Sequence, residues 1–182
     1  MMSQIEPRQL MAANRLIERL MKTVLDMAPG AARLRLTRLR DGAAWPHYDV
    51  THTVVARGRR IGAMRQNQPL SDWRDFLPAL LAGQCTLHRV VERGSAAPAF
   101  GFPSARPSRV LVCPVTSVDG PLLGAIFIVW DCDARPPAGS ALRALKAATR
   151  QLVTRIAAVL DLCDALSRPA PACETERNRQ VA

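Results

Sequence analysis

The stretch from Arg109 to Trp130, RVLVCPVTSVDGPLLGAIFIVW, limits the possible folds more than any other part of the chain. In an antiparallel sheet with one face in water, apolar and polar residues alternate along each strand. Here residues 110–113 and 125–130 are apolar without interruption, and Asp119-Gly120 between them is a strong hairpin signal. We therefore predict two central antiparallel strands that are covered on both faces, which requires helices on both sides of the sheet.

Two long amphipathic helices are predicted at the ends of the chain. The first begins near Pro7 and ends at Pro29-Gly30, with apolar residues at alternating steps of three and four. The second runs from about Ala138 to Leu166, and its apolar stripe is continuous if Thr149 is counted. A helix of this kind can cover a sheet with one side and contact a partner chain with another. We therefore expect a homodimer whose interface includes Leu145, Leu152, Ile156 and Val159.

Three further strands and one short helix are predicted between these parts. Residues 31–42 alternate in the period of a half-exposed strand and slip in phase at Thr37. Residues 47–57 and 85–93 are the other strand candidates. In residues 69–84, Ser71 is the expected N-cap of a helix, Gly83 its end and Pro78 a break or kink within it.

Residues 93–108 form a long segment rich in proline and small residues, which predicts a loop. Phe100 and Phe102 within it have no reason to stay in water, so we expect them to fold back as a lid over an apolar surface. The end of the chain has neither periodicity nor apolar density. We therefore expect one domain over residues 1–166 and a disordered tail over residues 167–182.

The composition predicts a soluble, cytoplasmic protein without a membrane partner. No apolar run approaches the ~20 residues that cross a bilayer. The net charge is +10, and almost all of the positively charged side chains are arginines, since Lys22 and Lys146 are the only lysines. Nucleic acid is a possible partner but is not favoured, because aromatic residues do not interleave the basic ones as stacking platforms.

No catalytic or metal-binding pattern stands out. The five cysteines are odd in number and irregularly spaced, and the Cys85-x-x-His88 pair has no second pair at zinc-binding spacing. The three histidines are scattered, and no nucleophile elbow or phosphate-binding glycine loop is present. We expect no catalytic residues and no metal site, and the sequence identifies no cofactor.

Residues 110–131, VLVCPVTSVDGPLLGAIFIVWD, followed by a long amphipathic helix, resemble the closing half of a GAF domain. Pro114 and Gly124 occupy the places expected for that family, and the first helix running into AARLRLTRLRDGA resembles its opening half. The resemblance covers roughly residues 8–166. It implies an α+β fold with a central antiparallel sheet of about five or six strands, the long terminal helices on one face, and a shorter helix and loops on the other.

The resemblance implies a regulatory domain that binds a small molecule and signals through a protein partner or a change in its dimer. The ligand would lie on the face away from the long helices. The candidate ligand-binding residues, to which Trp45 can be added, are Tyr48, His52, Trp73, Phe76, His88, Phe100 and Phe102. Bilin attachment usually needs a cysteine followed directly by histidine, a spacing from which Cys85 and His88 depart.

Two alternatives remain open. One is a thiol reductase like the free methionine sulfoxide reductases, which use this fold, although their cysteine motif is missing and no neighbouring charge pattern predicts a lowered thiol pKa. The other is a ligand-free adaptor that contacts a protein or nucleic acid. Its surface would be one continuous exposed patch formed by Arg33, Arg35, Arg57, Arg59 and Arg60.

Overall fold

The computed structural model describes residues 7–40, 47–59, 66–90, 108–118 and 120–167. The elements are α1 (Pro7–Asp26), β1 (Arg33–Arg40), β2 (His47–Val55), β3 (Gln68–Pro69), the 3₁₀ helix η1 (Leu70–Trp73), α2 (Leu77–Leu81), β4 (Thr86–Val90), β5 (Ser108–Thr116), β6 (Leu122–Trp130) and α3 (Gly139–Ser167). The six strands form one sheet in the order β3-β2-β1-β6-β5-β4, and every neighbouring pair is antiparallel. The predicted fold class is confirmed.

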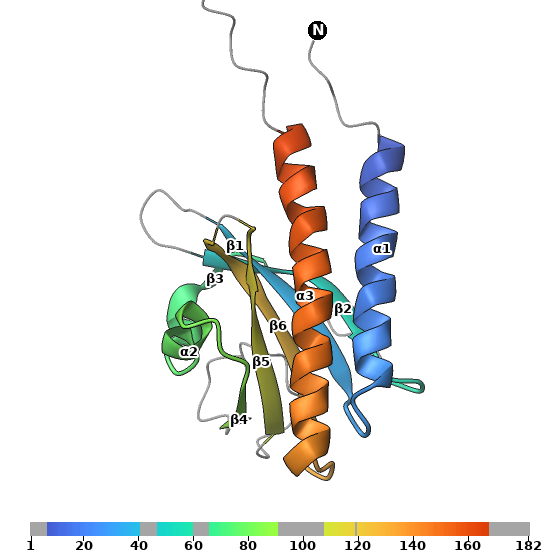
Figure 1. Ribbon diagram of the computed structural model, residues 1–182, viewed down its shortest axis with the longest axis vertical. Coiled ribbons are helices and arrows are strands. Elements are labelled where there is room, and N and C mark those ends of the chain that lie inside the picture. Colours follow the sequence, from blue (N-terminus) through green and yellow to red (C-terminus); the bar gives the residue numbers. More distant parts are fainter. Residues whose placement is uncertain (1–6, 41–46, 60–65, 91–107, 119, 168–182) are drawn as a thin grey trace, which may run out of the picture.

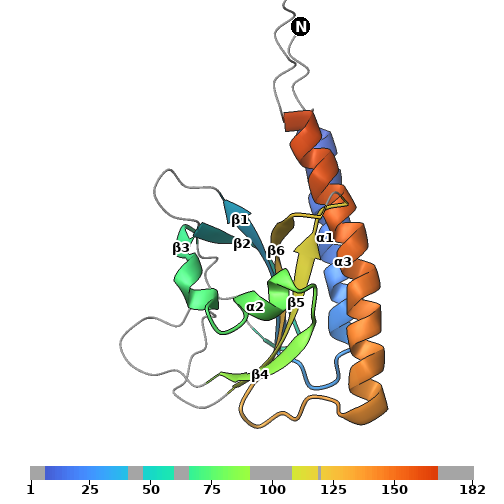
Figure 2. The same ribbon diagram turned by 60° about the vertical axis from the view of Figure 1, so that its left-hand side comes forward.

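The two long helices lie side by side against one face of the sheet (Figure 1). η1 and α2 lie on the opposite side, as the turned view shows (Figure 2). No helix in the described part of the chain is long and apolar enough to cross a membrane. The sheet is thus the middle of three layers, as the apolar hairpin requires.

The central hairpin sends alternate side chains into two separate apolar layers. We call the one beneath α1 and α3 the helix-side layer, to which the hairpin contributes Leu111, Cys113, Val115, Ile126, Ile128 and Trp130. We call the other the aromatic layer; it consists of Tyr48, Val50, Trp73, Phe76, Leu80, Val110, Val112, Ala125, Phe127 and Val129. Both faces of β5 and β6 are therefore buried, as predicted.

Gly124 allows the close approach of β6 to β1. A Cβ added at Gly124 would lie 2.0 Å from the backbone oxygen of Thr37, so no other residue fits without a backbone shift. Beside it, the Thr37 hydroxyl donates to the Ala125 oxygen at 3.0 Å and accepts the Ala125 N–H at 3.2 Å. This contact fixes the register of β1 against β6.

Polar contacts attach the last turns of α3 to the sheet. Ser117, in the turn after β5, donates through its hydroxyl to Asp161 Oδ2 at 2.9 Å, and Arg38 of β1 forms an ion pair with Asp164. The apolar stripe of α3 faces the same chain. Leu145, Leu152 and Ile156 are buried in the helix-side layer, and Val159 packs against it. Four residues expected at a dimer interface thus serve the core of a single chain, while dimer formation itself stays a prediction.

The phase slip predicted at Thr37 coincides with a register shift between Leu36 and Thr37. The extra residue lies in β2 rather than in β1, because Leu36 pairs with His52 whereas Thr37 pairs with Val50. Thr51 is therefore the inserted residue. The bulge turns Tyr48 and Val50 toward the aromatic layer and His52 toward the helix side.

In place of the single helix expected after Ser71, the chain forms two short ones, the 3₁₀ helix η1 and the α-helix α2. Ser71 lies inside η1, whose N-cap residue is Pro69, and no side chain caps that helix. α2 begins only at Leu77, with Pro78 in its first turn, where the missing N–H of proline costs no hydrogen bond. The predicted cap at Ser71 is wrong, and Pro78 starts a helix rather than kinking one. Gly83, at φ 69°, follows the end of α2 as predicted.

Candidate functional site

Four aromatic side chains of the aromatic layer contact one another edge to face or tilted. Trp73 lies between Tyr48 and Phe127, with ring centroids 4.9 and 5.5 Å away. Phe76 contacts Phe127 at 6.2 Å. η1 supplies Trp73, and the short segment before α2 supplies Phe76, so this covering segment packs directly on β6.

The indole N–H of Trp73 is buried and has no hydrogen-bond acceptor among the described residues. A buried donor without an acceptor costs about 1–3 kcal/mol, so such groups are rare in folded proteins. Trp130, on the other side of the sheet, shows the ordinary arrangement, in which the indole donates to the Pro29 oxygen at 3.0 Å. The Trp73 N–H is therefore a donor that a bound acceptor would satisfy.

Other polar groups lie on the same side of the sheet. The Tyr48 hydroxyl donates to Oδ2 of Asp72 at 3.1 Å. Arg35 is directly opposite Phe127 on the neighbouring strand, which places both side chains on one face, and Arg35 is only 3% exposed. A buried guanidinium thus lies on the aromatic side of the molecule and not in the exposed arginine patch predicted from the sequence.

His88 of β4 lies at the edge of the aromatic layer. Its ring contacts Phe76, with centroids 4.7 Å apart, and its Nε2 is 2.6 Å from the Thr86 hydroxyl. Burial lowers the pKa of His88, more than the nearby Asp75 carboxylate raises it, and the Lys146 charge lowers it further. The ring is therefore neutral at physiological pH.

The structure brings together four of the predicted ligand-binding residues, namely Tyr48, Trp73, Phe76 and His88. His52 is not among them. The bulge in β2 directs it to the helix side, where burial lowers its pKa against the opposing effect of Glu18 on α1. Trp45, Phe100 and Phe102, and with them the expected lid and the tail from residue 168, lie outside the described residues.

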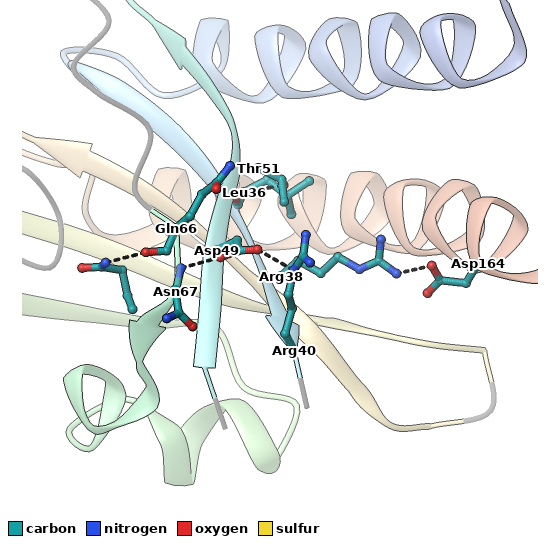
Figure 3. A network of polar contacts seen from close by, with 9 residues as sticks. Leu36, Arg38, Arg40, Asp49, Thr51, Gln66, Asn67 and Asp164 are labelled. Carbon is teal, nitrogen blue, oxygen red and sulfur yellow. Dashed lines mark hydrogen bonds and ion pairs between the residues drawn. The ribbon is translucent and has the colours of Figure 1, made fainter. Parts of the chain in front are cut away.

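A polar network on β2 holds the segment that leads into η1 (Figure 3). The buried carboxylate of Asp49 accepts the backbone N–H of Asn67 at 2.6 Å and pairs with the Arg40 guanidinium at 2.5 Å. Asn67 has φ 54°, a conformation that asparagine tolerates better than most residues. Asp49 thereby fixes the turn from which β3 and η1 carry Trp73 onto the sheet.

The continuous exposed arginine patch predicted for the adaptor alternative is wrong. Arg35 is buried on the aromatic side. Arg33 is partly buried and, like Arg59, forms an ion pair with Asp131, at 3.5 and 2.9 Å respectively. Arg57 is exposed, and Arg60 lies outside the described residues. The charge of this region is thus partly neutralised and interrupted.

Cys85 and His88 face opposite sides of the sheet, since Cys85 belongs to the helix-side layer and His88 contacts Phe76. No group of three or more His, Cys, Asp or Glu side chains within the described ranges could hold a metal ion. The thiols of Cys85 and Cys113 do meet, and Arg150 and Lys146 act on both. The expectation that no neighbouring charge would lower a thiol pKa is therefore wrong.

Comparison with known proteins shows the class to which this architecture corresponds. No protein-family model and no curated protein matches the sequence. Solved structures match over nearly the whole chain, and they show that it has the GAF fold.

The GAF domain of PixJ from Thermosynechococcus elongatus, in its blue-light-absorbing form, is 14% identical, with 90% of this chain and 93% of that chain covered at a TM-score of 0.58. The GAF domain/HD domain protein from Geobacter sulfurreducens is 14% identical, with 84% and 94% covered at a TM-score of 0.55. A far-red cyanobacteriochrome photoreceptor is 13% identical, with 86% and 88% covered at 0.54. These neighbours include photoreceptor domains.

Proposed function

We propose that this chain is a sensory GAF-type domain that binds a small molecule on the aromatic side of its sheet, beneath η1 and α2. The observation that carries the proposal is the buried indole N–H of Trp73, which has no acceptor among the described residues. A ligand that accepts this hydrogen bond would remove the cost of burying the donor. The GAF fold, which the chain shares with photoreceptor domains, supports a sensory role.

The surrounding side chains define the chemistry of the ligand. Tyr48, Trp73 and Phe76 offer aromatic faces and edges to a planar, largely apolar group. Trp73 requires an acceptor atom, and the buried Arg35 favours a ligand that carries negative charge or a carbonyl oxygen. Covalent attachment through Cys85 is not part of the proposal, because Cys85 lies in the helix-side layer. Binding would be passed on through a protein partner or a change in a homodimer.

Native mass spectrometry of the purified protein tests the proposal. We expect a co-purifying small molecule that is lost when the protein is unfolded and refolded in clean buffer. In Trp73→Phe, which keeps an aromatic ring but lacks the N–H, the occupied fraction should fall. Trp130→Phe is the matched control, because its indole donates to Pro29 on the other side of the sheet and occupancy should not change. Equal occupancy in wild type and Trp73→Phe, or no bound molecule in wild type, would overturn the proposal.

A further inference from the structure

Cys113 of β5 and Cys85, the residue directly before β4, lie opposite each other beneath α3. In the antiparallel pairing of β4 with β5, Thr86 is opposite Val112 and Leu87 is opposite Leu111. The same register, continued by one residue, sets Cys85 opposite Cys113. Both are free and buried in the helix-side layer, and their thiols are hydrogen-bonded to each other.

The distance between directly opposite residues suits a disulfide. Cα atoms of such pairs are about 4.5–5.5 Å apart, and disulfides span about 4.4–6.8 Å between Cα atoms. The register therefore places the two residues at a Cα separation that a disulfide can span. Cys132, which follows β6, and Cys163, on α3, are not part of this pair.

The surroundings make one thiol of the pair more reactive than the other. The hydrogen bond from Cys113 and the charges of Arg150 and Lys146 outweigh burial and lower the pKa of Cys85 from 9.0 to about 7. Arg150 also hydrogen-bonds the Cys85 sulfur, and it lies one turn from Lys146 on α3. The hydrogen bond to Cys85 and burial raise the pKa of Cys113, so Cys113 keeps its proton.

We propose that Cys85 and Cys113 form a peroxide-sensitive dithiol switch, which closes into a reversible cross-strand disulfide beneath α3. This inference is independent of the proposed ligand, because the pair lies on the other side of the sheet from Trp73. Cys85, beside two cations of α3, is the attacking thiolate, and Cys113 resolves the intermediate.

The reaction balances with a hydroperoxide as the oxidant. The Cys85 thiolate attacks one peroxide oxygen, the O–O bond breaks, and the products are a Cys85 sulfenic acid and, from hydrogen peroxide, water after protonation. The Cys113 sulfur then attacks the sulfenic sulfur, and the hydroxyl group leaves with the thiol proton as a second water. Two thiols and one hydrogen peroxide thus give one disulfide and two waters, and a dithiol reductant reverses the change.

The disulfide would alter two parts of the molecule. It would covalently join the segment at the start of β4, the edge strand of the sheet, to its neighbour β5. It would also remove the thiolate beside Arg150 and Lys146, and leave two cations of α3 without that counter-charge. Both changes act on the layer between the sheet and the C-terminal helix.

The test uses the full chain with Cys132, Cys163 and Cys173 replaced by serine, which leaves only the proposed pair. With a small excess of hydrogen peroxide, we expect the intact mass to fall by two hydrogens, the count of free thiols to fall from two to zero, and dithiothreitol to restore both. Peptide mapping of the peroxide-treated wild-type protein should find the linked peptides of Cys85 and Cys113. Cys85→Ser should abolish the linkage.

Arg150→Gln tests the activating charge, with Arg155→Gln, an exposed arginine on the same helix, as its matched control. We expect the rate of disulfide formation to fall several-fold in Arg150→Gln and to stay unchanged in Arg155→Gln. Thiols that survive peroxide in the folded protein, oxidation of Cys85 to sulfinic acid without a disulfide, or a wild-type linkage to another cysteine would overturn the proposal.

Discussion

Trp73 and Trp130 are both fully buried, on opposite sides of the same sheet, and they differ in one bond. Trp130 donates its indole N–H to the Pro29 oxygen, whereas Trp73 has no acceptor in the described part of the chain. Since both rings are buried against the same sheet, replacing each tryptophan by phenylalanine shows the effect of the indole hydrogen bond separately from the effect of burying the ring. If the Trp73 N–H serves a ligand, its loss should affect ligand binding, whereas loss of the Trp130 N–H should affect stability alone.

The stability of two variants without ligand provides the first prediction. Trp130→Phe removes a hydrogen bond and leaves the Pro29 oxygen without its donor, whereas Trp73→Phe removes a donor that had no acceptor. After the ligand has been stripped, Trp130→Phe should lower the free energy of unfolding by about 1–2 kcal/mol more than Trp73→Phe does. Urea denaturation measures both values. An equal or larger loss in Trp73→Phe would mean that its N–H is already satisfied.

The histidines make stability depend on pH. Burial lowers the pKa of His88 and of His52 below 6.5, so at mildly acidic pH the unfolded chain binds protons that the folded chain does not. The contribution of these neutral rings is therefore complete above pH 6.5 and is lost as the pH falls below it. Replacing His88 and His52 by glutamine should reduce the difference in urea midpoint between about pH 8 and about pH 5. An unchanged difference would contradict the effect of burial.

Among the elements, the β1–β6 pairing depends on a single small residue. Gly124 lies where a Cβ would meet the Thr37 oxygen, so β1 and β6 could not keep their present separation with any other residue there. The bulge at Thr51 is the corresponding device in β2, because it sends Tyr48 and His52 to opposite faces. The absence of a side chain at Gly124 and the extra residue at Thr51 both determine how the strand fits against the backbone of β1.

Gly124→Ala provides the prediction at this scale. The added methyl group must displace the backbone of β1, so we expect a loss of about 1–3 kcal/mol in the free energy of unfolding, the range typical of overpacked sites. Denaturation by urea, followed through tryptophan fluorescence, measures the loss. A variant as stable as the wild type would show that the strands separate at no cost.

Much of the element order was predictable because it depends on local patterns. Uninterrupted apolar residues in the hairpin require two covered faces, and the three-four spacing defines α1 and α3. The inserted residue in β2 was not predictable from the apolar slip at Thr37, since a bulge is shared between two strands and the sequence of one does not show which carries the extra residue. The cap predicted at Ser71 is wrong because Pro78 lies in the first turn of α2, a position that proline favours, so the helix starts at Leu77.

At the scale of the whole molecule, the candidate site and the thiol pair lie on opposite faces of one sheet. The local pattern around Cys85 and Cys113 identifies neither as a partner of the other, because their contact follows from the register of β4 against β5. Four ligand-site residues were predictable as aromatic side chains, of which Trp73 and Phe76 lie on the covering segment and Tyr48 and His88 on strands β2 and β4. The burial of Arg35 was not predictable, because its alternation with Leu34 and Leu36 is typical of a strand with one solvent-exposed face. In the structure that face is covered by the aromatic layer.

Differences in burial among the apolar residues of the helix layer allow folding and dimer formation to be tested separately. Leu152 lies in the helix-side layer, whereas Leu16 on α1 and Met27, the residue after the end of α1, are 42% and 44% exposed. We predict that Leu152→Glu unfolds the chain, whereas Leu16→Glu stays folded and weakens any dimer formed on the outer surface of the helix layer. Circular dichroism and light scattering measure the two effects. A folded monomer from Leu152→Glu would show that the residue serves an interface rather than the core.

The central claim is that a small molecule accepts the hydrogen bond of the Trp73 indole. Nitrogen-15 NMR of the indole N–H groups, assigned through Trp73→Phe and Trp130→Phe, tests it by comparing protein as purified with protein stripped of ligand by unfolding and refolding. We predict that the Trp73 signal moves between the two preparations while the Trp130 signal, held by Pro29, stays in place. A Trp73 signal that stays unchanged while mass spectrometry records the loss of a bound molecule would contradict the claim.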